Sequence, residues 1–275
     1  MKSEETAGRG WQCPPPGRVE PENQAGTNTL TRTLNAMRYL LERIEGRLDP
    51  QRQSRQSLWY VAHRFGTRDR KLAKQYILKS QVRKLHLGCG WNLLPGWLNM
   101  DNFPRCREAL YLDVRRPFFF SSDTFDYIFS EHMIEHMSYH DGVHMLAECH
   151  RILKGFGKIR ISTPDLAFLI KLYRADKSSL QREYVTWANR SFLKDSPEDN
   201  EVFVINNFMR NWGHIFIYDE NTLKTAMVNA GFTDITKHTL QNSKEDALCR
   251  LENLTRIPTH FLELETITLE GTKAG

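Results

Sequence analysis

A short apolar strand that runs directly into a glycine turn determines most of what this chain can fold into. Residues 85–90 read LHLGCG, and glycine tolerates positive φ and leaves no side chain between the backbone and a ligand. Further short apolar runs with polar groups near their ends follow at 98–101, 110–113 and 125–130. Because ligands bind beyond the carboxyl ends of the strands in an open parallel sheet, these ends predict one shared ligand site.

Strands and helices alternate from about residue 83 onward, which predicts an α/β domain with a mostly parallel sheet. Ser138 begins a capping box ahead of a helix with one apolar face, and the strand over 158–164 ends at its proline. A further helix is expected over 219–230, and two final strands over 232–240 and 266–273.

The path from Gly90 to Asp101 is unusually short. Ten residues separate them, whereas a crossover between parallel strands normally takes a dozen or more residues including its helix. The first helix of such a fold is therefore expected to be missing here.

Composition divides the 275 residues into three expected parts. Residues 1–28, rich in proline and glycine, read as a disordered leader. Residues 29–81 read as a basic helical extension, and Lys and Arg outnumber Asp and Glu about two to one over the first 84 residues. Residues 82–275 form the main domain. A helical insertion at 167–213 is expected to cover its site, its aromatic side chains forming either the core of a lid or a substrate surface.

The start of the chain predicts a cytoplasmic protein. Its first residues are charged and lack the apolar core of a secretion signal. No stretch approaches the roughly 18 uninterrupted apolar residues of a membrane span.

The run from residue 85 to residue 166 resembles class I S-adenosylmethionine-dependent methyltransferases, particularly their type 11 branch. The matching segments are LHLGCG (85–90), LNMD (98–101), YLDV (111–114), FDYIFSEHMIEHM (125–137), LAECHRILKGFGKIRIS (146–162) and GHIFIYDENTLKTAMVNAGF (213–232). The resemblance implies an α/β fold: a Rossmann-like class I methyltransferase sheet with helices on both faces, preceded by the helical N-terminal extension. It also implies S-adenosylmethionine as the cofactor.

The resemblance assigns the first cofactor contacts to the glycine turn and the second strand. Gly88, Cys89 and Gly90 would pass close under the methionine part of the cofactor, where backbone amides can meet its carboxylate. Asp101, at the end of its strand, would accept hydrogen bonds from the ribose hydroxyls.

The next two strand ends would complete the cofactor site. Asp113 would hold the adenine by its amino group and Val114 by apolar contact. Ser130 and Glu131 would lie beside the sulfonium and the entering acceptor. An aspartate after a strand also commonly caps a turn, but the shared register of several strand ends favours a ligand role here.

Two histidines are candidate bases for methyl transfer to a small-molecule or saccharide hydroxyl, and no dedicated metal site is predicted. His132 lies two residues beyond Ser130, where the strand opens. His214 would enter the site from the end of the insertion. The acceptor class follows from family association alone.

A competing motif overlaps this region. Residues 132–136 match H-x-x-E-H, in which two histidines on one helical face bind zinc and the glutamate activates water in a metallopeptidase. That chemistry requires a continuous helix and a third ligand further along the chain. Because the motif begins just after a predicted strand, methyl transfer is favoured over peptidase activity.

The basic extension raises a third alternative, a nucleic-acid-binding or nucleic-acid-modifying protein. Its arginines alternate with glutamates, and no aromatic side chains are interleaved as a base-stacking surface. No Asn-Pro-Pro-aromatic sequence, the mark of many amino-methylating DNA enzymes, occurs in the chain. A solvated helical face is therefore favoured over a nucleic-acid partner.

Overall fold

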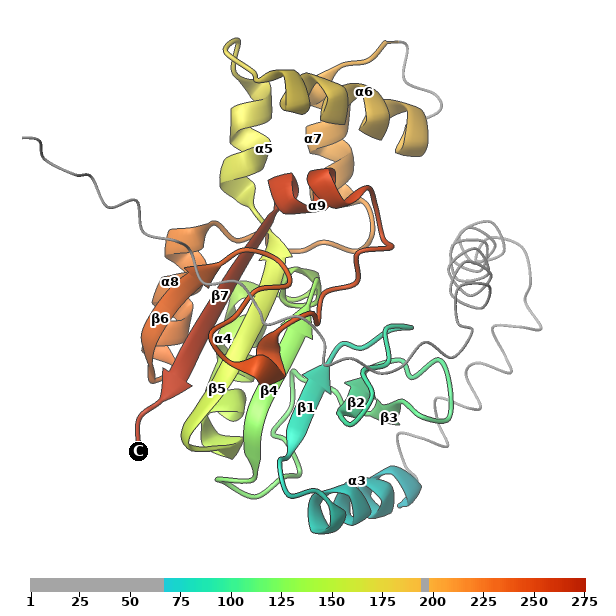
Figure 1. The fold of residues 1–275 in the computed structure, drawn as a ribbon. Helices are drawn as coiled ribbons and strands as arrows, with labels where there is room; N and C mark the ends of the chain where they lie inside the picture. Colours follow the sequence, from blue (N-terminus) through green and yellow to red (C-terminus); the bar gives the residue numbers. More distant parts are fainter. Residues whose placement is uncertain (1–66, 194–197) are drawn as a thin grey trace, which may run out of the picture.

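The computed structural model describes residues 67–193 and 198–275 (Figure 1). The expected leader at 1–28 and most of the expected extension at 29–81 lie outside these ranges. The last helix of the extension, α3 (Arg68–Lys79), is described. None of the helices in the described ranges is long and apolar enough to cross a membrane.

A seven-stranded sheet with the order β3-β2-β1-β4-β5-β7-β6 forms the centre of the domain (Figure 1). The strands are β1 (Lys84–Leu87), β2 (Leu98–Asp101), β3 (Leu110–Tyr111), β4 (Phe125–Glu131), β5 (Leu153–Pro164), β6 (Phe232–His238) and β7 (Thr266–Lys273). Neighbouring strands are parallel except at β7, which runs antiparallel to both β5 and β6. The predicted Rossmann-like sheet is confirmed. The strand order reverses between β1 and β4, which is where such sheets bind ligands.

Most of the predicted helices are present, with caps where the sequence placed them. Beyond α3 the helical elements are η1 (Ile134–His136), α4 (Tyr139–Ile152), α5 (Leu166–Tyr173), α6 (Ser179–Phe192), α7 (Glu201–Arg210), α8 (Glu220–Asn229), η2 (Asp246–Leu248) and α9 (Thr259–Glu265). The Ser138 side chain accepts from Asp141 N at the start of α4, and Asp219 caps α8 through Thr222 N. These caps satisfy amides that an α-helix leaves unpaired at its first turn.

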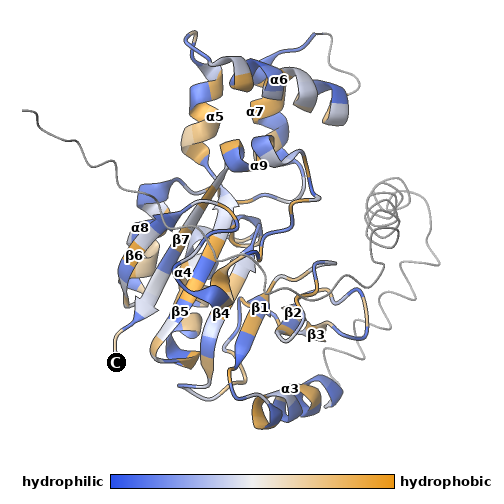
Figure 2. Cartoon of the chain, viewed as in Figure 1, coloured by the Kyte–Doolittle hydropathy of each residue, from blue (hydrophilic) through white to orange (hydrophobic). Residues whose placement is uncertain are grey.

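One face of the sheet carries the main hydrophobic core. Figure 2 shows hydrophobic residues in orange along the central strands. Alternate residues of each strand point into it, among them Leu85 and Leu87 of β1 and Ile159 of β5. Met145 of α4 and Met227 of α8 pack against them and are fully buried. Burial of such side chains contributes about 1.5 to 3 kcal/mol each, so this layer supplies much of the stability of the domain.

The opposite face departs from the expectation of helices on both faces. Segment 239–258 covers it, and in the described ranges its helical content is limited to the 3-10 turn η2. The connection 88–97 between β1 and β2 and the connection 102–109 between β2 and β3 contain no helix. Connections this short cannot hold crossover helices, so a C-terminal segment protects this face instead.

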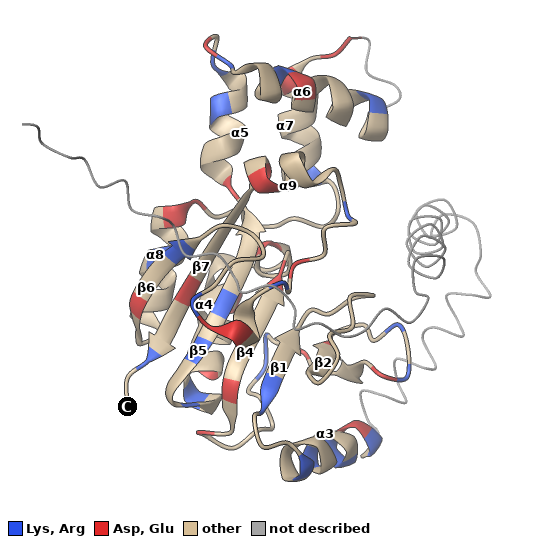
Figure 3. Cartoon of the chain, in the orientation of Figure 1, with Lys and Arg blue, Asp and Glu red and all other residues tan. Residues whose placement is uncertain are grey.

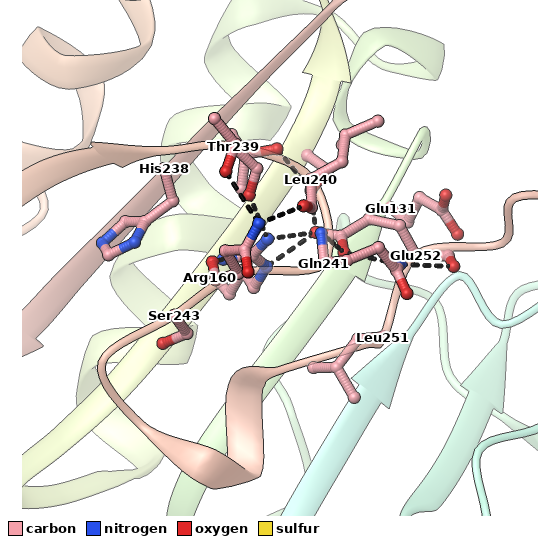
Figure 4. Close-up of polar contacts among 12 residues, drawn as sticks. Glu131, Arg160, His238, Thr239, Leu240, Gln241, Ser243, Leu251 and Glu252 are labelled. Carbon is pink, nitrogen blue, oxygen red and sulfur yellow. Dashed lines mark hydrogen bonds and ion pairs between the residues drawn. The ribbon is translucent and has the colours of Figure 1, made fainter. Parts of the chain in front are cut away.

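A buried arginine forms hydrogen bonds that connect segment 239–258 to the sheet (Figure 4). Arg160 of β5 donates from Nε to Glu252 Oε1 and from Nη1 to Glu270 Oε1, each over 2.6 Å. Its guanidinium also donates to the carbonyls of Thr239 and Asn242. Figure 3 colours the Lys and Arg residues of the sheet and its covering segment blue and the Asp and Glu residues red. One side chain thereby joins β5, β7 and segment 239–258.

A separate helical layer lies over the carboxyl ends of β4 and β5 (Figure 1). Helices α5, α6 and α7, within the insertion predicted at 167–213, share a second hydrophobic cluster with α9. Tyr184 and Phe208 are buried in this cluster and Trp187 packs against it, whereas Tyr173 is exposed. Most of the aromatic side chains of the insertion therefore form the core of the layer.

Candidate active site

The glycine turn after β1 is held to the end of β2 by backbone hydrogen bonds. Gly88 N and Cys89 N both donate to Met100 O, over 2.9 and 3.1 Å. Gly90 N donates to Asp101 Oδ2 over 2.9 Å. The connection that follows contains no helix, which confirms the missing first helix. The methionine end of a cofactor would therefore meet a loop here.

The two glycines of the turn serve different purposes. Gly88 has φ +69° and Gly90 has φ +50°, a conformation that glycine adopts without strain. A Cβ at Gly88 would lie 2.4 Å from Met133 Cγ, so this glycine makes room for the loop after β4. A Cβ at Gly90 would meet no heavy atom within 4 Å. The open space beside Gly90 fits a bound cofactor.

Asp101 presents its carboxylate at the same edge of the sheet. Its Oδ1 accepts from Phe103 N over 2.7 Å, while Oδ2 accepts from Gly90 N. A carboxylate offers about four lone-pair sites, so both oxygens keep capacity for a ligand hydroxyl. The surrounding amides fix the carboxylate in place.

Asp113 is buried at the end of β3 beside Val114, which is also buried. Its Oδ1 accepts from Arg115 Nε over 2.9 Å, and Arg116 Nε lies 3.4 Å from Oδ2. Burial raises the pKa of Asp113, but the hydrogen bonds and charges of the two arginines outweigh burial and hold the pKa below its usual value. The carboxylate is therefore ionised and already oriented. Burial raises the pKa of the Cys89 thiol, so that side chain acts as a small apolar group.

The end of β4 carries two buried polar side chains. Ser130 Oγ has no hydrogen-bond partner, which leaves a polar atom available to a ligand. Glu131 accepts from Asn253 N through both carboxylate oxygens, over 3.0 and 3.1 Å. Burial raises the pKa of Glu131 to about 7, so its charge is sensitive to pH near neutrality.

His132 follows directly and has φ +45°. Its side chain is 5% exposed, with Nδ1 3.5 Å from Glu135 Oε1 and Nε2 3.3 Å from Thr266 Oγ1. Burial lowers the pKa of His132 well below its ordinary value, and the charge of Arg256 acts in the same direction. The imidazole is neutral at physiological pH, the form that accepts a proton.

Glu135 joins the β4 loop to the end of the helical layer. It is fully buried, and its carbonyl accepts from Ile215 N and Phe216 N over 2.8 and 3.1 Å. These bonds bring His214 beside His136, with ring centroids 5.0 Å apart. The predicted site residue His214 therefore lies next to the 132–136 loop although it is distant in the sequence.

Sequence reasoning missed two contributors to this cluster. Thr163 Oγ1 donates to Glu135 Oε2 over 3.0 Å and orients the carboxylate. Arg256, in the segment before α9, acts by its charge on Glu131, Glu135 and His214. Neither residue lies in a recognisable motif, because the contacts depend on chain segments that meet only in the folded sheet.

The peptidase interpretation of residues 132–136 requires a correction. Strand β4 ends at Glu131, His132 has a left-handed backbone conformation, and η1 contains three residues only. The motif therefore lacks the continuous helix that would place both histidines on one face. The nucleic-acid alternative, which the sequence does not favour, rests mainly on residues outside the described ranges and is not tested by the structure.

Residues 109–161 match a family model described as a methyltransferase domain, of the type 11 family. A search of curated proteins finds no match. Similar solved structures include an S-adenosylmethionine-dependent methyltransferase of Archaeoglobus fulgidus, with 15% identity, 78% of this chain and 98% of that chain covered, and a TM-score of 0.42. Another is a Thermotoga maritima methyltransferase titled a possible histamine N-methyltransferase, with 18% identity, 79% and 94% coverage, and a TM-score of 0.41.

The strand order and the family match over residues 109–161 support an S-adenosylmethionine-dependent methyltransferase of class I. The matched segment is similar to the type 11 branch of that class, which supports the resemblance seen in the sequence. S-adenosylmethionine is accordingly the cofactor. The open space at Gly90, the fixed carboxylate of Asp101 and the unpartnered Ser130 Oγ fit a group of this kind.

Proposed function

We propose that this enzyme transfers the methyl group of S-adenosylmethionine to a hydroxyl of a small-molecule or saccharide acceptor. The observation that carries the proposal is the meeting of Gly90, Asp101 and Ser130 at the carboxyl edge of β1, β2 and β4, on either side of the point where the strand order reverses. Open parallel sheets bind their ligands at this edge.

The cofactor supplies an electrophilic methyl carbon attached to a positively charged sulfur. Residues 88–90 and Asp101 would hold its methionine and ribose parts, and Asp113 with Val114 its adenine. Ser130 and Glu131 would face the sulfonium. The ionised Asp113 and the fixed amides of the glycine turn are preorganised for these contacts.

His132 and His214 are the bases of this proposal. Transfer forms a carbon–oxygen bond to the acceptor and breaks the carbon–sulfur bond, while the hydroxyl proton passes to an imidazole. His132 is neutral and buried behind Glu135, and burial lowers the pKa of the more exposed His214 to about 4. Both imidazoles are therefore able to accept a proton at neutral pH.

The acceptor would enter between the β4 loop and the helical layer. Segment 213–216 closes this side through its bonds to the Glu135 carbonyl. Arg256 supplies a positive charge there, which suits an acceptor that carries an anionic group near the reacting hydroxyl.

Calorimetry with S-adenosylmethionine and S-adenosylhomocysteine tests the cofactor site. Asp101→Ala should weaken both ligands about 10- to 100-fold, equivalent to roughly 1.4 to 2.8 kcal/mol. Asp176→Ala is the matched control, because Asp176 is an exposed residue paired with Arg174. Absence of cofactor binding by the wild type would overturn the function. Unchanged binding by Asp101→Ala would overturn the site.

Radiolabelled methyl transfer to a panel of monosaccharides, glycans and small alcohols tests the acceptor. A base-stable methyl ether is the expected product. If the methyl group were transferred to amines alone, the hydroxyl would be the wrong acceptor, but the enzyme would still be a methyltransferase.

A further inference from the structure

Three metal-ligating side chains converge beside the end of β4. Glu135, His136 and His214 each offer one ligand atom, and these atoms all lie within 4.8 Å of one another. One carboxylate and two imidazoles form a donor set that zinc and other divalent transition ions accept in proteins. We infer that these side chains bind one divalent transition-metal ion, with Zn²⁺ as the expected occupant, and leave a coordination position for a further ligand.

The Glu135 carboxylate has an oxygen atom that is available to bind a metal ion. Its Oε2 accepts from Thr163 Oγ1, whereas its Oε1 is fully buried and makes no hydrogen bond. An unpaired carboxylate oxygen in the interior is costly unless a cation or a donor meets it. This Oε1 lies 3.9 Å from His136 Nε2 and therefore points into the cluster.

The tautomer of His214 also suits metal binding. Its Nδ1 lies 2.6 Å from Phe208 O. A carbonyl oxygen can only accept, so Nδ1 carries the proton and Nε2 keeps its lone pair. Metal-bound histidines commonly donate their second ring nitrogen to a carbonyl in this way, which fixes the orientation of the ring.

Closing the site requires a small movement of one exposed residue. Ligands at the usual zinc distances of about 2.0 to 2.1 Å lie about 3.4 Å from one another in a tetrahedron. In the structure Glu135 Oε1 lies 3.9 Å from His136 Nε2, and the three ligand atoms lie within 4.8 Å of one another. The side chain of His136 is 37% exposed, so its ring can turn inward while Glu135 stays fixed.

The ligand set differs from that of the peptidase motif in the sequence. In that motif the glutamate activates water, whereas here Glu135 is itself a ligand and His214 replaces the first histidine. With the ion bound, the Nε2 lone pair of His214 is no longer available to a proton, and His132 is the base of the proposed transfer. His132 approaches the Glu135 carboxylate with its Nδ1 at 3.5 Å and would support the ligand from outside the coordination sphere.

The role of the ion in catalysis rests on the proposed function, whereas binding of the ion does not. An ion held by one carboxylate keeps a net positive charge, and the neighbouring Arg256 adds another. An anionic group of the acceptor would offset these charges, and its hydroxyl would occupy the open coordination position. A divalent ion lowers the pKa of a bound hydroxyl, which assists its loss of a proton during methyl transfer.

Zn²⁺ titration of the full-length, chelator-treated protein, in competition with a chromogenic chelator, tests the site. The wild type should bind one Zn²⁺ per chain. His136→Ala and His214→Ala should each weaken binding by more than the roughly 10- to 100-fold that loss of an outer partner costs. His140→Ala is the matched control, since His140 is an exposed histidine of the nearby helix α4. Co²⁺ in place of Zn²⁺ should give visible absorption bands that His214→Ala removes.

Circular dichroism of each variant separates loss of a ligand from loss of the fold. If Glu135→Gln fails to fold, the two histidine variants still decide the question. Absence of Zn²⁺ binding by the wild type, or unchanged binding by both histidine variants, would overturn the inference. If the wild type binds S-adenosylhomocysteine but does not bind Zn²⁺, the metal site is overturned and the proposed function stands. If it binds Zn²⁺ but binds neither S-adenosylmethionine nor S-adenosylhomocysteine, the proposed function is overturned and the metal site stands.

Discussion

Arg160 and Glu252 are fully buried and joined by a hydrogen bond of 2.6 Å, although 92 positions separate them in the chain. Glu252 Oε1 also accepts from Ser162 Oγ, and Glu252 Oε2 accepts from Gln241 N. The carboxylate is therefore fully hydrogen-bonded. Such pairs position a segment more than they stabilise it, because desolvation offsets most of the attraction between the charges.

Breaking this pair should destabilise the domain strongly. Glu252→Ala leaves the guanidinium of Arg160 buried with one carboxylate fewer, and we expect a loss of about 3 to 5 kcal/mol in the free energy of unfolding. Urea denaturation followed by circular dichroism measures this loss. Arg174→Ala, which breaks an exposed pair with Asp176, should leave the midpoint unchanged. Equal midpoints for Glu252→Ala and wild type would contradict the structural role of the pair.

The two glycines of the cofactor turn should respond differently to alanine. Gly88→Ala adds a methyl group 2.4 Å from Met133 Cγ in a left-handed conformation, so strain and overpacking should together cost about 2 to 4 kcal/mol. Gly90→Ala meets open space and should cost about 1 to 2 kcal/mol from the backbone alone. Thermal unfolding compares the two variants. A larger loss of stability for Gly90→Ala than for Gly88→Ala would contradict the close packing of Gly88 against Met133 and the open space at Gly90.

Glu265 should make stability depend on pH in a direction unusual for a carboxyl group. Burial raises its pKa to about 7, against about 4.3 in an unfolded chain. The folded state therefore binds more protons between these values, and stability falls as pH rises through that interval. Glu265→Gln keeps an oxygen to accept from Tyr184 Oη and should be more stable than wild type at pH 8 by roughly 3 kcal/mol.

Denaturation curves at several pH values between 4 and 8 measure this difference. The exposed Glu263→Gln on the same helix is the control and should follow the wild type throughout. If the Glu265→Gln and wild-type curves ran parallel, titration of Glu265 would not be linked to folding.

His132→Ala should lower kcat about 10²- to 10⁴-fold if this imidazole accepts the hydroxyl proton. Burial lowers the pKa of His132, so the acidic limb of the wild-type pH–rate profile should lie below pH 6.5 and should disappear in the variant. Affinity for S-adenosylhomocysteine should not change. Methyl transfer at the wild-type rate across this pH range would exclude His132 as the base.

Much of the fold could be predicted because its signals are local. The glycine turn, the helix cap at Ser138 and the proline at the end of β5 each depend on residues close together in the sequence. The length of the path from Gly90 to Asp101 also predicted the absence of a helix, since a crossover helix needs more residues than this connection has.

The covering of the second face and the centre of the candidate site could not be predicted in this way. Arg160 reads as a surface residue in a strand that alternates in polarity, and only Glu252 and Glu270 from later segments explain its burial. Glu135 likewise stands in a motif typical of a helix, but the backbone leaves the strand through a left-handed His132. Contacts between residues far apart in the sequence therefore determine both the burial of Arg160 and the position of Glu135.

The order in which the sheet is completed has a consequence for synthesis of the protein. Strand β7 lies between β5 and β6 but is the last of the strands to leave the ribosome. Until segment 239–273 has emerged, Arg160 lacks both of its carboxylates and two strand edges remain unpaired. The nascent chain therefore keeps these two strand edges unpaired until β7 has emerged, and insertion of β7 between β5 and β6 is the event that completes the sheet.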